Sequence, residues 1–94
     1  MKPVILIYYA EICGLCQKAM EWMRSRGLEF EAVEVFWDSA HDHWVDDANS
    51  RRMLQECGNV DFVPQIFING HHIMGWRRLE PMIRSGEIES ILKG

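Results

Sequence analysis

Two cysteines separated by two residues, Cys13 and Cys16, are the side chains of this sequence best suited to chemistry. Cys16 begins an apolar stripe with helical spacing that continues through Ala19, Met20 and Met23. A cysteine at the first turn of a helix faces unpaired backbone N–H groups and the positive end of the helix dipole, which favour the thiolate. We therefore predict that Cys13 is an exposed nucleophile and that Cys16, on the buried stripe, is a sheltered resolving thiol.

The segments around the two cysteines have the order strand, turn and helix. The apolar run from Val4 to Tyr9 predicts a buried strand, and Gly27 can end the helix expected over residues 14–26. The order strand, helix, strand, helix and hairpin indicates an α/β sandwich with a mixed sheet. The remaining expected elements are a strand at 29–36, a helix near 45–57, strands at 65–69 and 71–74 joined by Asn69-Gly70, and two short C-terminal helices.

Length and composition restrict the class of protein. Ninety-four residues predict one domain over residues 1–94, and the hydrophobic content of 48% is that of an ordinary globular protein. The net charge of −4 argues against a nucleic-acid partner. The apolar run near the N-terminus is too short for a signal peptide or a membrane span, so we expect no membrane association. Three cysteines do not resemble a secreted disulfide framework, and we expect a cytoplasmic monomer.

Zinc binding is the main alternative to redox chemistry for such a cysteine pair. Two further ligands would be needed, and Cys57 and four histidines are present in the sequence. No second cysteine pair and no histidine pair follows at the spacing of a zinc finger. We therefore predict a dithiol–disulfide pair and no metal site. For Cys57, we expect a small apolar side chain that packs inward.

The segment from Trp37 to Asp47 is the least regular part of the sequence. It is rich in aspartate and histidine and also contains Trp44. These residues could hold a metal ion or present Trp44 to a partner. The interpretation that we favour is a solvated loop that leads into the second helix, with Asp46 and Asp47 near the helix N-terminus, where acidic side chains are stabilising.

The sequence resembles the glutaredoxin family of the thioredoxin fold. Residues 62–68, Phe-Val-Pro-Gln-Ile-Phe-Ile, are similar to the family motif Thr-Val-Pro-Gln-Ile-Phe-Ile, and residues 5–16 resemble its first strand and active-site turn. The resemblance covers nearly the whole chain and is weakest over residues 36–50. It implies an α/β thioredoxin fold with a four-stranded mixed sheet flanked by helices.

The same resemblance implies a function and a set of site residues. It implies a small thiol–disulfide oxidoreductase that reduces protein disulfides or glutathione mixed disulfides, with glutathione as co-substrate and no tightly bound cofactor. Pro64 is expected to follow a cis peptide bond, which would leave the Val63 backbone free to pair with the substrate. Beside the catalytic Cys13 and Cys16, the residues expected to contact substrate or glutathione are Leu15, Phe62, Val63, Pro64, Gly75, Trp76, Arg77 and Arg78.

Departures from the family pattern leave two alternatives open. Arg77 and Arg78 stand where the family has paired acids for the γ-glutamyl ammonium of glutathione, and Ala10 replaces a lysine. Residues 74–78 are similar to the corresponding segment of glutaredoxin-like electron donors of ribonucleotide reductase, which are reduced by thioredoxin reductase. Gly14 replaces the usual proline, as in glutaredoxins that bind a [2Fe–2S] cluster through the first cysteine and glutathione.

Overall fold

The computed structural model describes residues 2–94. Its main sheet has the strand order β2-β1-β5-β6. These strands span Glu31–Glu34 (β2), Ile5–Tyr9 (β1), Gln65–Ile68 (β5) and His71–Met74 (β6). β2 is parallel to β1, whereas β5 is antiparallel to both β1 and β6. The predicted four-stranded mixed sheet flanked by helices is confirmed.

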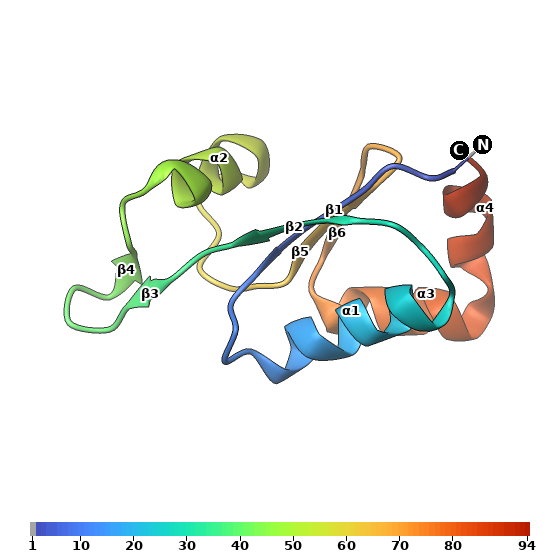
Figure 1. Ribbon diagram of the computed structural model, residues 1–94, viewed down its shortest axis with the longest axis horizontal. Coiled ribbons are helices and arrows are strands. Elements are labelled where there is room, and N and C mark those ends of the chain that lie inside the picture. Colours follow the sequence, from blue (N-terminus) through green and yellow to red (C-terminus); the bar gives the residue numbers. More distant parts are fainter. Residues whose placement is uncertain (1) are drawn as a thin grey trace.

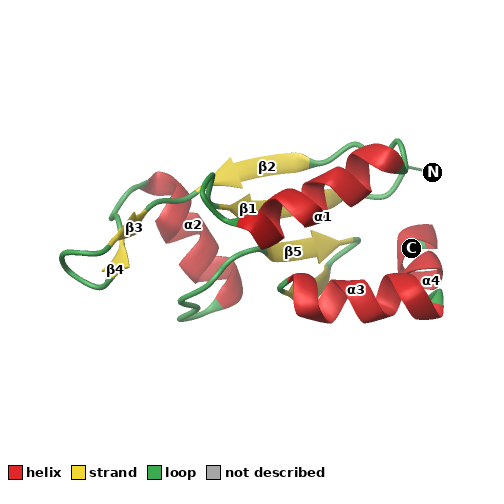
Figure 2. Ribbon diagram, turned by 90° about the horizontal axis from the view of Figure 1, so that it is seen from below, coloured by secondary structure: helices red, strands yellow, loops and turns green. Residues whose placement is uncertain are grey.

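Helices cover both faces of this sheet. α1 (Gly14–Ser25) and α3 (Trp76–Ser85) lie on one face and α2 (Ala48–Cys57) lies on the other, while α4 (Glu87–Lys93) stands at the far end beside both termini (Figure 1). Figure 2 shows α1 and α3 side by side in front of the sheet. No helix within residues 2–94 is long and apolar enough to cross a lipid bilayer.

Each face of the sheet has its own hydrophobic core, as the buried central strands require. Ile7 and Ile66 belong to the core under α1 and α3, which also contains Cys16 and Met23. Tyr8 belongs to the core under α2, which also contains Val33, Val35, Trp44, Met53 and Val60. Because β1 has apolar residues at successive positions, it supplies side chains to both cores.

The predicted loop of residues 37–47 and the predicted strand of residues 29–36 are wrong in detail. β2 ends at Glu34, and the chain then forms a separate hairpin of β3 (Trp37–Asp38) and β4 (His43–Trp44). The hairpin projects from the end of the molecule at which α1 begins (Figures 1 and 2). The segment is ordered because Trp44 is buried in the core under α2 and its Nε1–H donates to the Val60 carbonyl at 2.8 Å.

Local sequence signals set two other boundaries. α2 begins at Ala48, later than the predicted residue 45, because Asp47 is its N-cap and accepts a hydrogen bond from Ser50 N–H at 2.8 Å. Asn69 and Gly70 have φ angles of 49° and 83°, as a two-residue hairpin turn of type I′ requires. The predicted turn between β5 and β6 and the acidic N-terminus of α2 are confirmed.

Candidate active site

Cys13 lies at the N-cap of α1, where the turn after β1 becomes a helix. Its Sγ accepts a hydrogen bond from the Cys16 backbone N–H at 3.2 Å, and its own N–H donates to the Ala10 carbonyl at 3.0 Å. The sulfur therefore faces a backbone donor and the positive end of the helix dipole, both of which favour a negative charge there. The side chain is half-buried, and it is more exposed than that of Cys16.

Cys16 lies one turn further along α1 and is completely buried with Ala19, Met20 and Met23. This placement confirms the predicted buried stripe. Burial, followed by the hydrogen bond with Cys13, raises the pKa of the Cys16 thiol well above its ordinary value. The two cysteines thus differ in access and in environment, as an attacking and a resolving thiol should.

The segment before β5 brings its backbone to the sulfur of Cys13. The Cys13 thiol donates to the Val63 carbonyl at 3.6 Å, and the Val63–Pro64 peptide bond is cis. Gln65 supports this segment through its side-chain amide. Its Nε2 donates to the Phe62 carbonyl at 2.8 Å, and its Oε1 contacts His72 Nε2 at 2.8 Å. Because the amide nitrogen of Gln65 is the donor to Phe62, its oxygen accepts, and His72 carries its proton on Nε2.

Gly75 brings a second segment to the same place. Its φ angle is 95°, and a Cβ atom added to it would lie 3.4 Å from the ring of Phe62. Glycine is therefore favoured by the backbone conformation, while the Phe62 ring lies within van der Waals contact of a Cβ at this position. Phe62 remains 42% exposed, so its ring forms an open wall beside Val63.

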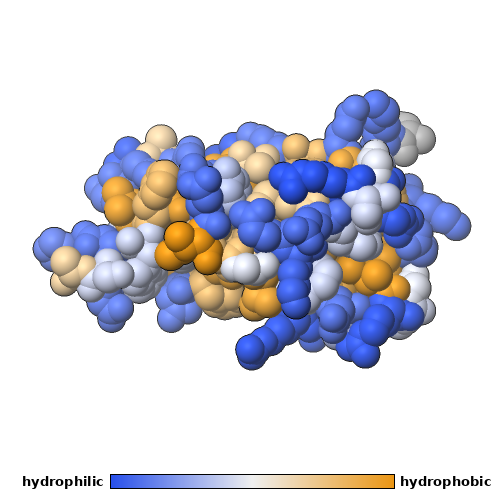
Figure 3. Space-filling view, turned by 60° about the horizontal axis from the view of Figure 1, so that its bottom comes forward, coloured by the Kyte–Doolittle hydropathy of each residue, from blue (hydrophilic) through white to orange (hydrophobic). Residues whose placement is uncertain are grey.

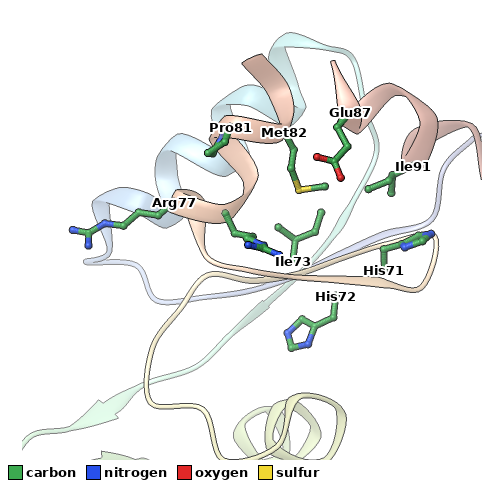
Figure 4. A pocket seen from close by; sticks show the side chains of 9 residues that line it. His71, His72, Ile73, Arg77, Pro81, Met82, Glu87 and Ile91 are labelled. Carbon is green, nitrogen blue, oxygen red and sulfur yellow. The ribbon is translucent and has the colours of Figure 1, made fainter. Parts of the chain in front are cut away.

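The other predicted contact residues are spread more widely around the cysteines. Leu15 is exposed on the first turn of α1, and Trp76 is half-buried against the core that contains Cys16. Arg77 and Arg78 line a cavity of about 430 Å³ between β6, α3 and α4. In Figure 4 the Arg77 side chain points away from those of His71 and Ile91. The two arginines are therefore part of a cavity that neither cysteine lines.

Sequence reasoning missed a second cavity, whose wall includes the three residues that precede Cys13 in the chain. It has a volume of about 250 Å³ and lies between the turn of residues 10–12 and the chain that leaves β2, with Phe36 and Trp37 in its wall. A hydrogen bond of 2.8 Å from Val35 N–H to the Tyr9 carbonyl holds these two segments together. The aromatic pair at 36–37 was the available signal, but the interpretation of this region as a solvated loop hid it.

The remaining candidate residues lie apart from the cysteine pair. Cys57 is half-buried against the core under α2, as predicted, and burial raises the pKa of its thiol to about 11. In the hairpin, His41 contacts Asp38 at 2.8 Å. Within residues 2–94, no three His, Cys, Asp or Glu side chains are grouped closely enough to hold a metal ion.

Comparisons with known proteins agree on one family. A family model described as Glutaredoxin matches residues 5–73. The chain is 31% identical over 80 residues to bifunctional monothiol glutaredoxin-S16, chloroplastic, of Arabidopsis thaliana, covering 85% of this chain and 25% of that protein. It is 29% identical over 87 residues to glutaredoxin 3 of Escherichia coli K12, covering 93% of this chain and 94% of that protein.

The fold comparison gives the same result. A buckwheat glutaredoxin solved as a complex with glutathione has a TM-score of 0.71 and 25% identity, over 95% of this chain and 76% of that one. The chain spans a quarter of the Arabidopsis protein and nearly all of the Escherichia coli protein. Both the sequence matches and the fold match therefore extend over most of this chain.

Proposed function

The chain belongs to the glutaredoxin family, and we propose that it acts as a small thiol–disulfide oxidoreductase through Cys13 and Cys16. The observation that carries this proposal is the geometry of Cys13 Sγ. The sulfur lies at the N-cap of α1, 3.2 Å from the Cys16 N–H and 3.6 Å from the Val63 carbonyl. A disulfide that approaches Cys13 therefore meets a nucleophile, a backbone edge and a resolving thiol together.

The proposed reaction consists of two exchanges. The Cys13 thiolate attacks one sulfur of the substrate disulfide; a Cys13–substrate bond forms, the substrate S–S bond breaks, and the departing sulfur takes up a proton. The Cys16 thiol then loses its proton and attacks Cys13 Sγ, which forms the Cys13–Cys16 disulfide and releases the second substrate thiol. Two electrons and two protons pass from the enzyme dithiol to the substrate.

The burial of Cys16 separates the roles of the two thiols. Because its raised pKa keeps Cys16 protonated, only Cys13 is ready to attack an incoming disulfide. Cys16 reacts when the mixed disulfide at Cys13 offers a sulfur one helical turn away. Cys13→Ser should therefore abolish all turnover, whereas Cys16→Ser should retain reduction of glutathione mixed disulfides and lose dithiol reduction of protein disulfides.

Glutathione is the co-substrate that we propose for regenerating the dithiol. The complex of buckwheat glutaredoxin with glutathione supports this choice. Two glutathione thiols would reduce the Cys13–Cys16 disulfide through a mixed disulfide at Cys13 and leave as glutathione disulfide. Leu15, Phe62, Val63, Pro64, Gly75 and Trp76 are the residues that we propose to contact glutathione.

A specific observation favours a second candidate reductant. The first turn of α3 contains no acidic residue, and Arg77 and Arg78 are exposed there. A positive charge at this place opposes the ammonium group of glutathione. Reduction by thioredoxin reductase, with ribonucleotide reductase as the disulfide-bearing substrate, is therefore the alternative proposal.

The deciding experiment measures NADPH oxidation with a small disulfide substrate and two reducing systems. One system contains glutathione and glutathione reductase, and the other contains thioredoxin reductase alone. Turnover in the glutathione system supports the main proposal. Turnover only in the thioredoxin reductase system removes the assignment of glutathione. Cys13→Ser is the control in both systems. No turnover in either system, or undiminished turnover by Cys13→Ser, would contradict the proposed dithiol mechanism.

A further inference from the structure

The cavity lined by residues 10–12, 34–37 and 39 shares no lining residue with the set proposed to contact glutathione. Its apolar lining comes from Ile12, which is 97% exposed, and from Phe36 and Trp37. In Figure 3 hydrophobic atoms gather on the left part of the visible face, next to the projecting end of the molecule. Ile12 immediately precedes Cys13 in the chain, and the Cys13 N–H donates to the carbonyl of Ala10, another lining residue, at 3.0 Å.

The aromatic wall of this cavity is held rigidly from behind. The Trp37 ring meets the buried Trp44 ring edge to face, with centroids 4.8 Å apart at an angle of 89°. The Phe36 carbonyl accepts a hydrogen bond from Val45 N–H at 2.8 Å. An exposed aromatic side chain fixed in this way loses little conformational freedom on binding, which suits a recognition surface.

Two carboxylates give the cavity a negative rim. Glu11 and Glu34 both line it, and within residues 2–94 neither side chain takes part in an ion pair. Glutathione, whose two carboxylates exceed its single ammonium in charge, is disfavoured here. The volume of about 250 Å³ is below the usual range of about 300–1,000 Å³ for whole ligands and suits one apolar side chain.

We propose that this cavity selects protein substrates: it receives an apolar side chain of the extended segment that carries the reactive disulfide, and Glu34 and Glu11 favour a lysine or arginine next to it. The inference rests on the proposed oxidoreductase activity. Residues 10–12 of its wall lead directly into Cys13, so a substrate segment joined to Cys13 by a disulfide extends over the neighbouring surface. The aromatic wall and the acidic rim then determine which neighbouring side chains fit.

Three synthetic peptides with an internal disulfide test both parts of this selection. One carries Leu and Lys beside the reactive cysteine, the second replaces Lys with Glu, and the third replaces Leu with Ser. The pre-reduced enzyme is mixed with each peptide in a single turnover, and formation of the Cys13–Cys16 disulfide is followed by mass spectrometry. No reducing system is required, because each peptide disulfide accepts the two electrons of one enzyme dithiol.

We expect the wild-type protein to react about fivefold faster with the Lys peptide than with the Glu peptide, the change that corresponds to one exposed ion pair. Glu34→Lys should reverse this order. The Leu peptide should react about tenfold faster than the Ser peptide, and Trp37→Ala should reduce that ratio to near one. Glu21→Lys on α1 and Val4→Ala, at the residue that precedes β1, are matched controls that should keep both wild-type ratios.

The outcomes separate this inference from the function on which it rests. If the wild-type protein does not react even with a small symmetric disulfide, the oxidoreductase proposal fails. If it reacts with that disulfide but reacts at the same rate with all three peptides, or faster with the Glu peptide, the proposal that the cavity selects substrates is overturned. Circular dichroism checks the fold of Trp37→Ala. Should that variant be unfolded, Glu34→Lys still decides, because within residues 2–94 the Glu34 carboxylate takes part in no ion pair that its loss would break.

Discussion

Gly14, in the active-site turn, is a position at which the effect of a proline on protein stability can be measured. It is the first residue of α1, and a Cβ atom added to it would meet nothing within 4 Å. Its conformation is therefore not one that only glycine can adopt, unlike that of Gly75 with its φ angle of 95°. Cys13 before it has φ and ψ angles of −87° and 109°, which lie in the extended region and close to the range that a following proline favours.

We predict that Gly14→Pro stabilises the reduced protein by about 0.4–1 kcal/mol, because proline restricts the unfolded chain and fits the first position of a helix. Urea unfolding measures the change. Gly14→Ala is the control, since it adds helix propensity without the ring. A loss of stability in Gly14→Pro would show that the turn needs the freedom of glycine.

Among the elements, β5 and β6 support the segment that faces Cys13 through a chain of partly buried hydrogen bonds. His72 on β6 stacks on Phe67 of β5, with ring centroids 4.5 Å apart and planes 7° apart. It also contacts Gln65, which in turn donates to the Phe62 carbonyl. Burial lowers the pKa of His72 below 6.5, so the folded protein favours the neutral ring.

This pKa predicts a dependence of stability on pH. Below pH 6.5 the unfolded chain takes up a proton at His72 that the folded chain resists, so stability is fully present above that pH and falls as the pH is lowered. In His72→Phe, which keeps an aromatic ring over Phe67, the loss of stability between about pH 7.5 and about pH 5.5 should be smaller. Urea unfolding at both pH values measures it, and equal losses in the two proteins would contradict the role of His72.

The β3–β4 hairpin depends on one side chain for its attachment to the domain. Trp44 is buried, donates to the Val60 carbonyl and supports Trp37. We predict that Trp44→Phe costs about 1 kcal/mol through the lost hydrogen bond and that Trp44→Ala costs about 3–5 kcal/mol.

Hydrogen exchange at the Val45 amide, which is bonded to the Phe36 carbonyl, reports on the hairpin itself. Exchange should accelerate more in Trp44→Ala than the change in global stability explains. If the two changes are equal, the hairpin opens only when the whole protein unfolds, and Trp44 is not its local anchor.

On the scale of the whole molecule, the two ends of the sheet carry different parts of the structure. The end with the start of α1 and the hairpin carries Cys13 and its surroundings, while both termini and α4 lie at the other end (Figure 1). Asn69 joins three segments at that second end. Its Oδ1 accepts from Val4 N–H at 2.9 Å, and its Nδ2 donates to the carbonyls of Ile91 at 2.8 Å and Leu92 at 3.3 Å.

We predict that Asn69→Gly, which keeps the positive φ angle without strain, costs about 1–3 kcal/mol through these lost hydrogen bonds. Asn69→Ala should cost about 1 kcal/mol more, because alanine is strained at that φ angle. Single-turnover reduction of a small disulfide should be unchanged in Asn69→Gly at a temperature where it is fully folded. A slower reaction would show that the two ends are coupled.

The sequence by itself determined the order of the main elements and the identity of the cysteine pair. An apolar run before Cys13, a stripe at helical spacing from Cys16 and the Asn69-Gly70 turn are local signals, and local signals are set by backbone geometry and burial over a few residues. The start of α2 was missed by three residues because several nearby acids could have capped it. Only the hydrogen bond between Asp47 and Ser50 distinguishes them.

Only the tertiary structure decided what surrounds Cys13. The Val63 carbonyl lies 50 positions along the chain from Cys13, and the Phe62 ring packs on Gly75. The motif resemblance suggested that these residues belong together, but their distances depend on the pairing of β1, β5 and β6. Residues 37–47 have little local signal for a strand, since their acids and histidines are typical of a loop. They form a hairpin because Trp44 gains burial against Val60, which lies 16 positions further along. That long-range contact also supports Trp37 in the wall of the cavity that residues 10–12 line, and no local pattern in the sequence encodes it.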